Sequence, residues 1–205
     1  MDMNPENNIV RLVGTAAGRP ELSHESRGEA FYRLPLTVQR LSGTEDEIPL
    51  LLRRRQLEGL ELQEADKLCV TGELRSFNNR SGEGARLVIT VFVRTLAFCD
   101  EADENYVQLR GALCKPPKLR RTPMGRDICD LMLAVNRRCG RSDYLPCICW
   151  GQPAREAAEW AVGTHLTLSG RIQSRRYIKM TEVGALERTA YEVSAAQIER
   201  LTIEV

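Results

Sequence analysis

The chain contains an internal repeat, and this feature restricts its fold more than any other. The segment Asn8–Gly14 (NIVRLVG) resembles Asn105–Gly111 (NYVQLRG), which lies 97 positions further along. One offset that holds over several blocks indicates two copies of one domain. We therefore expect an N-terminal copy at residues 1–99, an acidic linker at residues 100–104 and a C-terminal copy at residues 105–205. The same offset, or an offset of 98, aligns Leu34–Arg40 with Leu131–Arg137, Pro49–Leu52 with Pro146–Cys149, and Val70–Ser76 with Leu168–Ser174.

Each copy has the sequence pattern of β-strands. In the C-terminal copy, apolar and polar residues alternate with the period of two that half-buried strands show. One helix is expected between the third and fourth strands, at Pro153–Val162, with a counterpart at Arg55–Ala65 in the N-terminal copy. Five strands with one short helix in this place are the layout of the OB-fold. The predicted fold class is therefore all-β, with two tandem OB-fold barrels of five strands each. The strands expected in the C-terminal copy are Val107–Gly111, Asp130–Val135, Leu145–Trp150, Leu166–Arg171 and Tyr191–Ile198.

Charge is distributed unequally between the two copies. The net charge of the whole chain is +1, but residues 1–102 carry 13 basic and 16 acidic side chains, whereas residues 103–205 carry 16 and 12. Arginine outnumbers lysine 25 to 4, and its guanidinium group offers both a fork for phosphate and a flat face for stacking. The basic second half therefore favours an anionic partner such as nucleic acid, although a solvated surface also carries arginine.

The seven cysteines, without a signal peptide, indicate reduced thiols rather than disulfides. Cys147 and Cys149 flank one residue, so in a strand both side chains would point to the same face. Zinc binding by these two with Cys114, Cys129 or Cys139 is an alternative, but paired C-x₂-C motifs are missing and the two histidines are isolated. We expect buried cysteines that act as small apolar side chains, and we expect no metal and no cofactor.

Other classes of protein are excluded by features that the sequence lacks. No apolar run approaches the ~18 residues that a membrane helix needs, and the polar N-terminus does not resemble a secretory signal. There is no phosphate-cradling glycine loop and no nucleophile paired with a base. We therefore expect a protein without catalytic residues or a membrane partner, located in the cytoplasm and associated with the nucleoid.

The C-terminal copy resembles the bacterial single-stranded DNA-binding protein family from Asn105 to about Leu201. Four motifs carry the resemblance, and the N-terminal copy matches them more weakly. Their order and spacing together are specific, and tandem OB-fold members of the family exist. The motifs are N-x-V-x-L-x-G at Asn105–Gly111, L-A-V-N-R at Leu133–Arg137, W-G at Trp150–Gly151 and L-x-G-R-I-x-S-R-x-Y at Leu168–Tyr177.

The resemblance implies that bases stack on aromatic side chains while cations follow the phosphates. Matched residue by residue, the stacking positions fall on Tyr144, Trp150 and Tyr177, and a fourth falls on Cys139, which cannot stack. Burial of Trp150 in the core, or of Tyr144 at the end of the barrel, is the alternative. The cations expected to contact phosphate in this copy are Arg137, Arg138, Arg175, Arg176 and Lys179, with Lys115, Lys118, Arg120 and Arg121 in the connection between the first and second strands.

The N-terminal copy keeps fewer of these features. Arg53 stands at the position that aligns with Trp150, and the copy is acidic overall. Its candidate contacts with DNA are Arg40, Arg53, Arg75 and Phe77. We expect this copy to bind DNA more weakly than the C-terminal copy, or to serve mainly in assembly.

The family works as a four-OB assembly, so two copies per chain imply a homodimer. The chain ends at Leu201–Val205, directly after the last strand, so replication proteins are not expected to be recruited through an acidic C-terminal tail. The leading hypothesis is a sequence-independent protein that coats and protects single-stranded DNA during replication, recombination or repair. A primosome-type accessory protein that acts mainly through protein contacts, or an RNA-binding chaperone, is the alternative.

Overall fold

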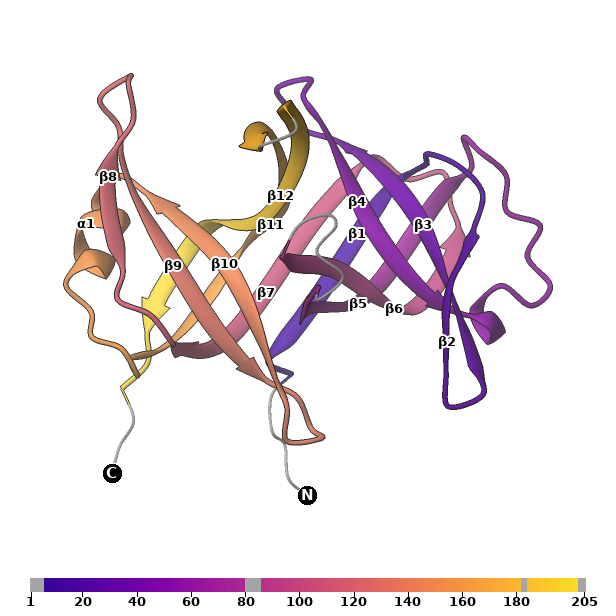
Figure 1. Cartoon of the computed structure of the whole chain (residues 1–205), viewed down its shortest axis with the longest axis horizontal. Coiled ribbons are helices and arrows are strands. Elements are labelled where there is room, and N and C mark those ends of the chain that lie inside the picture. The colour runs from indigo at the N-terminus through magenta and orange to yellow at the C-terminus, as the bar shows by residue number, and fades with distance from the viewer. Residues whose placement is uncertain (1–5, 80–85, 182–183, 203–205) are drawn as a thin grey trace. The chain divides into compact units, whose positions relative to one another are not determined.

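The computed structural model describes residues 6–79, 86–181 and 184–202, without the side chains of Lys179 and Thr181. The chain forms two compact units, shown in Figure 1. The N-terminal unit contains Val10–Tyr106 together with Gln173–Ala190. The C-terminal unit contains Val107–Ile172 together with residues 6–9 and 191–202 from near the two ends of the chain. Gln173–Ala190 thus belongs to the C-terminal copy by sequence and to the N-terminal unit by its contacts. In the described part of the chain, no helix is long and apolar enough to cross a membrane.

The barrel of the N-terminal unit is a ring of five strands. The first strand, β1, pairs with β3 and β5, β3 pairs with β4, β4 runs parallel to β6, and β6 pairs with β5. Alternating apolar side chains fill the inside, among them Leu12, Leu34, Leu50 and Val91, each at most 1% exposed. The strands of this unit are β1 (Asn8–Ala16), β2 (Glu21–Ser26), β3 (Glu29–Gln39), β4 (Glu45–Arg53), β5 (Lys67–Asn78) and β6 (Leu87–Phe98).

The C-terminal unit repeats this ring in the same order. Here β7 pairs with β9 and β11, β9 pairs with β10, β10 runs parallel to β12, and β11 and β12 are neighbours. The all-β prediction and the OB-fold strand order are therefore confirmed. The elements are β7 (Glu104–Leu113), β8 (Lys118–Arg121), β9 (Asp127–Asn136), β10 (Ser142–Trp150), α1 (Gln152–Ala158), β11 (His165–Thr181) and β12 (Gly184–Arg200).

Each ring also carries a sixth strand that the sequence did not predict. In the connection between the first two ring strands, β2 pairs with β3 and β8 pairs with β9. These strands widen one side of each ring, and they bring charged side chains such as Arg120 beside the second strand.

The predicted helices are wrong in length in one copy and in kind in the other. The helix α1 ends at Ala158, four residues before the predicted end, and it buries Ala154 and Ala157. In the N-terminal unit, the predicted Arg55–Ala65 helix is replaced by one 3-10 turn, Arg54–Gln56. Gly59 and Ala65 have φ values of +75° and +72°, which a right-handed helix cannot contain.

The glycines that end the repeated first-strand motif have the same structural reason in both copies. A Cβ atom on Gly14 would collide with the carbonyl oxygen of Thr37, and one on Gly111 would collide with that of Ala134. At these positions the first strand passes directly against the second strand to close the ring. Only glycine allows so close an approach of two backbones.

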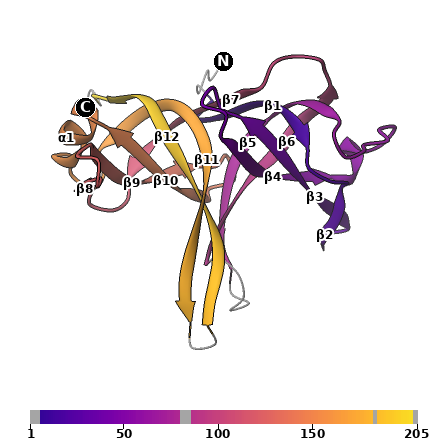
Figure 2. The same ribbon diagram turned by 90° about the horizontal axis from the view of Figure 1, so that it is seen from above.

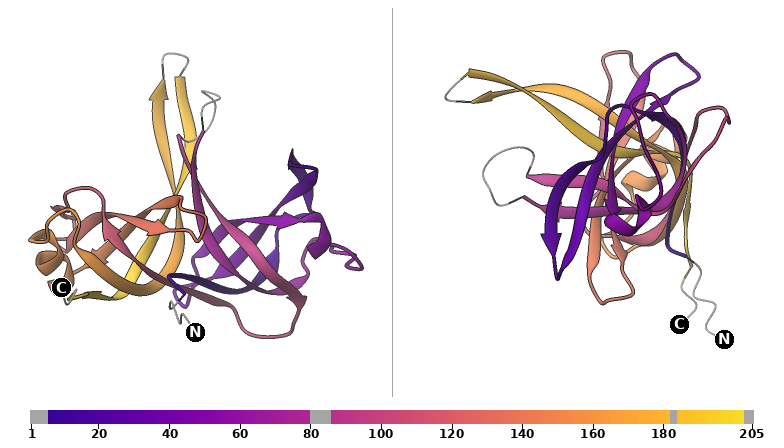
Figure 3. Two further views of the ribbon diagram at one scale, coloured as in Figure 1. Left: turned by 90° about the horizontal axis from the view of Figure 1, so that it is seen from below. Right: turned by 90° about the vertical axis from the view of Figure 1, so that its right-hand side faces the viewer.

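The strands β11 and β12 are each 17 residues long and extend past the barrel as a two-stranded ribbon (Figure 2). Figure 3 shows the ribbon from two further sides. A two-stranded ribbon buries little surface of its own and is only marginally stable without support.

Candidate nucleic-acid interface

Trp150 ends β10 on the outer surface of the C-terminal barrel. Its side chain is 37% exposed, so the alternative of a core tryptophan is wrong. The indole Nε1–H donates a hydrogen bond to Oγ of Ser194 at 3.3 Å, and the guanidinium carbon of Arg126 lies 5.6 Å from the ring centroid. The hydrogen bond and the cation hold the ring against the strands and leave part of it exposed to solvent. This arrangement provides a fixed aromatic surface beside a positive charge.

Arg126 is a site residue that the sequence analysis did not single out. It precedes β9, two residues before Ile128, which pairs with Trp150 across the strands. Its position in the basic stretch before the second strand was the only signal. Among the described residues, no carboxylate forms an ion pair with Arg126, so its charge is available to a phosphate.

Tyr144 lies on the same strand as Trp150 and on the same outer face, because an even number of residues separates them. It is 49% exposed, so it does not plug the barrel. The turn from β9 to β10 comes just before β10, with Arg138 and Cys139 exposed. Tyr144, Trp150, Arg126 and Arg138 form what we call the C-terminal face.

Arg137, which was predicted to contact phosphate, has a different arrangement. Its guanidinium group donates two hydrogen bonds to Asp143, one of them from Nε at 2.8 Å, and the Asp143 side chain is fully buried. These hydrogen bonds raise the pKa of Arg137 above its usual value. The pair closes the turn from β9 to β10, so the geometry favours a structural role for Arg137.

Arg40 repeats this arrangement in the N-terminal unit. Its Nε and one terminal nitrogen donate to the two oxygens of Asp46, each at 2.6 Å, and the Asp46 side chain is fully buried. The pKa of Arg40 is raised for the same reason. The two ion pairs are 97 residues apart, so the repeat includes a buried arginine–aspartate pair in each barrel.

The predicted cations around β8 are exposed but partly neutralised. Arg120 donates two hydrogen bonds to Asp130, at 2.7 and 2.9 Å, and Arg121 donates one to Asp127 at 3.1 Å. Lys115 and Lys118 are exposed. Exposed ion pairs of this kind are weak, so these arginines can exchange a carboxylate for a phosphate at little cost.

The ribbon of β11 and β12 carries the remaining predicted residues of the C-terminal copy. Arg175 and Arg176 are exposed and Tyr177 is half-buried. The guanidinium carbon of Arg175 lies 5.8 Å from the Tyr177 ring centroid. This repeats the pairing of an arginine with an aromatic ring that Arg126 and Trp150 form. The Lys179 side chain lies outside the described residues.

Arg53 of the N-terminal unit lies against aromatic rings that the sequence analysis missed. Its guanidinium carbon is 4.9 Å from the centroid of Phe92, and Nε lies 3.4 Å from a carboxylate oxygen of Glu29. Phe31 pairs with Arg53 across the strands, and its ring is 6.3 Å from Phe92. We call Phe31, Arg53 and Phe92, with Arg75, the N-terminal face.

Arg75 belongs to β5, which neighbours β6 on the side away from β4, and its guanidinium carbon lies 5.9 Å from the Phe92 ring centroid. The carboxylate of Glu73 forms short ion pairs with both Arg75 and Arg94. Phe77, two residues further along β5, is 47% exposed. The N-terminal copy therefore presents aromatic rings among arginines, although none stands at the position of Trp150.

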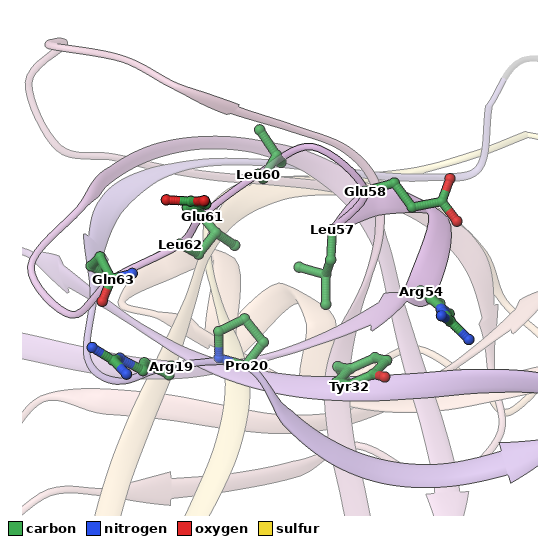
Figure 4. A pocket seen from close by; sticks show the side chains of 10 residues that line it. All are labelled: Arg19, Pro20, Tyr32, Arg54, Leu57, Glu58, Leu60, Glu61, Leu62 and Gln63. Atoms are coloured by element: carbon green, nitrogen blue, oxygen red, sulfur yellow. The ribbon is translucent and has the colours of Figure 1, made fainter.

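A shallow recess of about 490 Å³ opens where the N-terminal unit lacks a helix. Figure 4 shows Pro20, Leu57 and Tyr32 lining its centre, with Arg19 and Arg54 at opposite ends. Glu58 and Glu61 also line it, so its charges are mixed. None of the residues of the two faces lines this recess, although Arg54 and Tyr32, which follow Arg53 and Phe31 in the chain, do so.

The described cysteines are all free thiols, and they differ in burial. Cys129, Cys147 and Cys149 are buried, and Cys139 is exposed. Burial raises the pKa of Cys147 and raises that of Cys149 to about 12, so both remain uncharged at neutral pH and pack as apolar side chains. Within the described residues, no three histidine, cysteine or acidic side chains lie close enough together to hold a metal ion.

Comparison with known proteins gives consistent matches. The single-strand binding protein family matches residues 104–201. A "Single-stranded DNA-binding protein 2" from Listeria innocua is 39% identical over 80 residues, which cover 36% of this chain and 50% of that protein. A "Single-stranded DNA-binding protein" from Enterococcus faecalis is 40% identical over 36% of this chain and 43% of that protein. The matched part thus spans half or less of these curated relatives.

Two proteins from Thermus resemble the chain over almost its whole length. The single-stranded DNA-binding protein of Thermus thermophilus is 29% identical over 95% of this chain and 84% of its own. The crystal structure of the wild-type protein from Thermus aquaticus superposes with a TM-score of 0.75 at 28% identity, covering 97% of this chain and 94% of that chain. The C-terminal copy, residues 104–201, is thus similar to the single-strand binding protein family, and the whole chain is similar to the two Thermus proteins.

Proposed function

We propose that this protein binds single-stranded DNA without sequence specificity and coats it during replication, recombination or repair. The observation that carries the proposal is the exposed Trp150 ring, which is fixed by Ser194 and flanked by Arg126. Proteins that bind single strands combine such rings with cations, because every base has a flat face and every nucleotide has a phosphate. The names of the relatives from Listeria, Enterococcus and Thermus support the same ligand.

On the C-terminal face, the two exposed rings would serve successive parts of one strand. A base stacks on the free side of Trp150, and a second base stacks on Tyr144, which also belongs to β10. Arg126 and Arg138 neutralise the neighbouring phosphates. Each stacked base contributes ~1–3 kcal/mol, so two such positions provide a large share of the binding free energy.

The N-terminal face is a second binding surface in this proposal. Phe92 lies close to the guanidinium groups of both Arg53 and Arg75, with Phe31 nearby. Glu29 and Glu73 neutralise part of the positive charge, so we expect a weaker contribution than that of the C-terminal face. This surface agrees with the prediction of a weaker copy and gives it specific residues.

Titration with oligo-dT of about 35 nucleotides, followed by tryptophan fluorescence, tests the function. The Trp160→Phe variant leaves Trp150 as the single reporter, since the chain has two tryptophans. We expect saturable quenching with a submicromolar Kd at moderate salt. A Kd in the micromolar range or weaker would instead favour an accessory protein that acts through protein contacts. Competition with an RNA strand of equal length tests the preference for DNA.

We also propose that two chains associate, which would bring four OB-folds together. The proposal rests on the two barrels of this chain and on the four-OB assembly of the single-stranded DNA-binding protein family, which the C-terminal copy resembles. Light scattering at micromolar concentration should give twice the mass of the 23.1 kDa chain. A monomeric mass under these conditions would contradict it.

A further inference from the structure

Asp46 makes more contacts than an ion pair with Arg40 requires. Its Oδ1 atom also accepts a hydrogen bond from the backbone N–H of Ser174 at 2.8 Å and one from the Ser174 hydroxyl at 3.2 Å. The carboxylate is fully buried, and a buried carboxylate is stable only when its oxygens have partners. Arg40 and Ser174 together supply these partners, so Asp46 joins the turn from β3 to β4 to residue 174.

Ser174 stands at the root of the β11–β12 ribbon. It lies one residue before Arg175 and three before Tyr177, the residues of the ribbon that the sequence predicts to contact DNA. The segment Gln173–Ala190 belongs to the N-terminal unit by its contacts. Since a two-stranded ribbon has little stability of its own, contacts at its root determine where its side chains lie.

We propose that Asp46 is a positioning residue for DNA binding, which fixes the root of the ribbon and thereby places Tyr177 and Arg175. The inference rests on the proposed function, and it assigns Asp46 a role without contact to DNA. The N-terminal unit then uses an aromatic side chain from the C-terminal copy together with its own Phe92. The buried pair of Arg40 and Asp46 is the rigid base for this arrangement.

Hydrogen exchange of the intact protein tests the anchor without DNA. Asp46→Asn should accelerate amide exchange at residues 173–177 and leave the strands β9 and β10 unchanged. Asp143→Asn is the matched control, because Asp143 makes the same bidentate pair with Arg137 and should leave residues 173–177 unchanged. Equal exchange of the ribbon root in Asp46→Asn and the wild type would overturn the proposal.

A second variant excludes an effect of the unpaired arginine. Arg40→Ala combined with Asp46→Ala removes both charges together, so no buried charge remains without a partner. This variant should show the same faster exchange at residues 173–177. If only Asp46→Asn shows it, the ribbon responds to the uncompensated charge and not to the lost anchor, and the proposal fails.

Oligo-dT binding then tests the functional consequence. Tyr177→Ala should weaken binding about 5- to 150-fold in the wild type, but clearly less in the Asp46→Asn background, where Tyr177 is already misplaced. Trp150→Ala should weaken both proteins equally. An undiminished effect of Tyr177→Ala would overturn the positioning role, whereas absence of oligo-dT binding by the wild type would overturn the proposed function and leave the exchange result as the test of the anchor.

Discussion

The two barrels of this protein share one architecture but place their aromatic and cationic side chains at different positions. Across β8, β9 and β10 the paired residues are Arg120, Ile128 and Trp150. The indole N–H of Trp150 donates a hydrogen bond to Ser194 on β12. In the N-terminal barrel the corresponding row is His24, Phe31 and Arg53, and Arg53 lies over Phe92 on β6.

The strand registers of the two barrels correspond at these positions. Ile148 pairs with Ser194, and Leu51, which aligns with Ile148, pairs with Phe92. The tryptophan at the end of the third ring strand is thus replaced by arginine, and the small serine on the neighbouring strand is replaced by phenylalanine. Both barrels therefore combine a ring with a cation, although the ring lies on β10 in one barrel and on β6 in the other.

The largest expected effect concerns the feature that the barrels share, the buried ion pair. Asp143→Ala should lower the free energy of unfolding by about 3–5 kcal/mol, because Arg137 would be left without its buried partner. Asp46→Ala should cost a similar amount in the N-terminal barrel. Chemical denaturation measures both. Asp130→Ala, which breaks the exposed pair with Arg120, is the control and should cost no more than about 1 kcal/mol.

The aromatic side chains of the C-terminal copy should contribute the larger loss of affinity. Trp150→Ala combined with Tyr177→Ala should weaken oligo-dT binding by more than about tenfold, since each stacked base is worth ~1–3 kcal/mol. Fluorescence anisotropy of a labelled oligonucleotide measures the loss. Trp160→Phe should bind like the wild type, and unchanged affinity of a folded double variant would remove these residues from the interface.

The N-terminal face should show a smaller effect at its ring. Phe92→Ala should weaken oligo-dT binding by about fivefold, which corresponds to the lower end of the stacking range. Phe98→Ala is the matched control, because Phe98 is exposed on the same strand and lies outside the row. A loss as large as that of the Trp150 variant would show that the two faces contribute equally.

The smallest effect is expected in the salt dependence. Each phosphate contact on a single strand contributes about 0.7 to the slope of log K against log salt. Arg126→Ala should reduce that slope by about this amount, and Arg19→Ala, whose side chain lines the recess and lies outside both faces, should leave it nearly unchanged. Titrations at several salt concentrations distinguish the two variants, and equal slopes would exclude a phosphate contact at Arg126.

Much of the fold could be predicted from the sequence, because strand alternation and repeat spacing are local signals. The glycines of the repeated motif and the exposed Trp150 were found in the same way. The helix predicted at Arg55–Ala65 was wrong because its composition resembles a helix, whereas Gly59 and Ala65 adopt positive φ in a loop.

The partners of the arginines could not be predicted. Arg137 was predicted to contact phosphate because it lies near the predicted stacking positions, and Arg40 because its position suggested the surface, yet a carboxylate six residues further along binds each of them. Phe92 was missed because the offset between the copies changes. It is 97 at β4 and β10 but 102 at their parallel neighbours, where Val91 corresponds to Val193.

By itself, the sequence determined the two copies, the order of their strands and the side of Trp150, because these depend on periodicity within one strand and on spacing along the chain. Only the tertiary structure decided which arginines are bound to carboxylates and which aromatic rings lie beside them. The parallel pairing of β4 with β6 brings Arg53 and Phe92 together across 39 positions of sequence. Such neighbours are set by the closure of the barrel, and no local pattern records them.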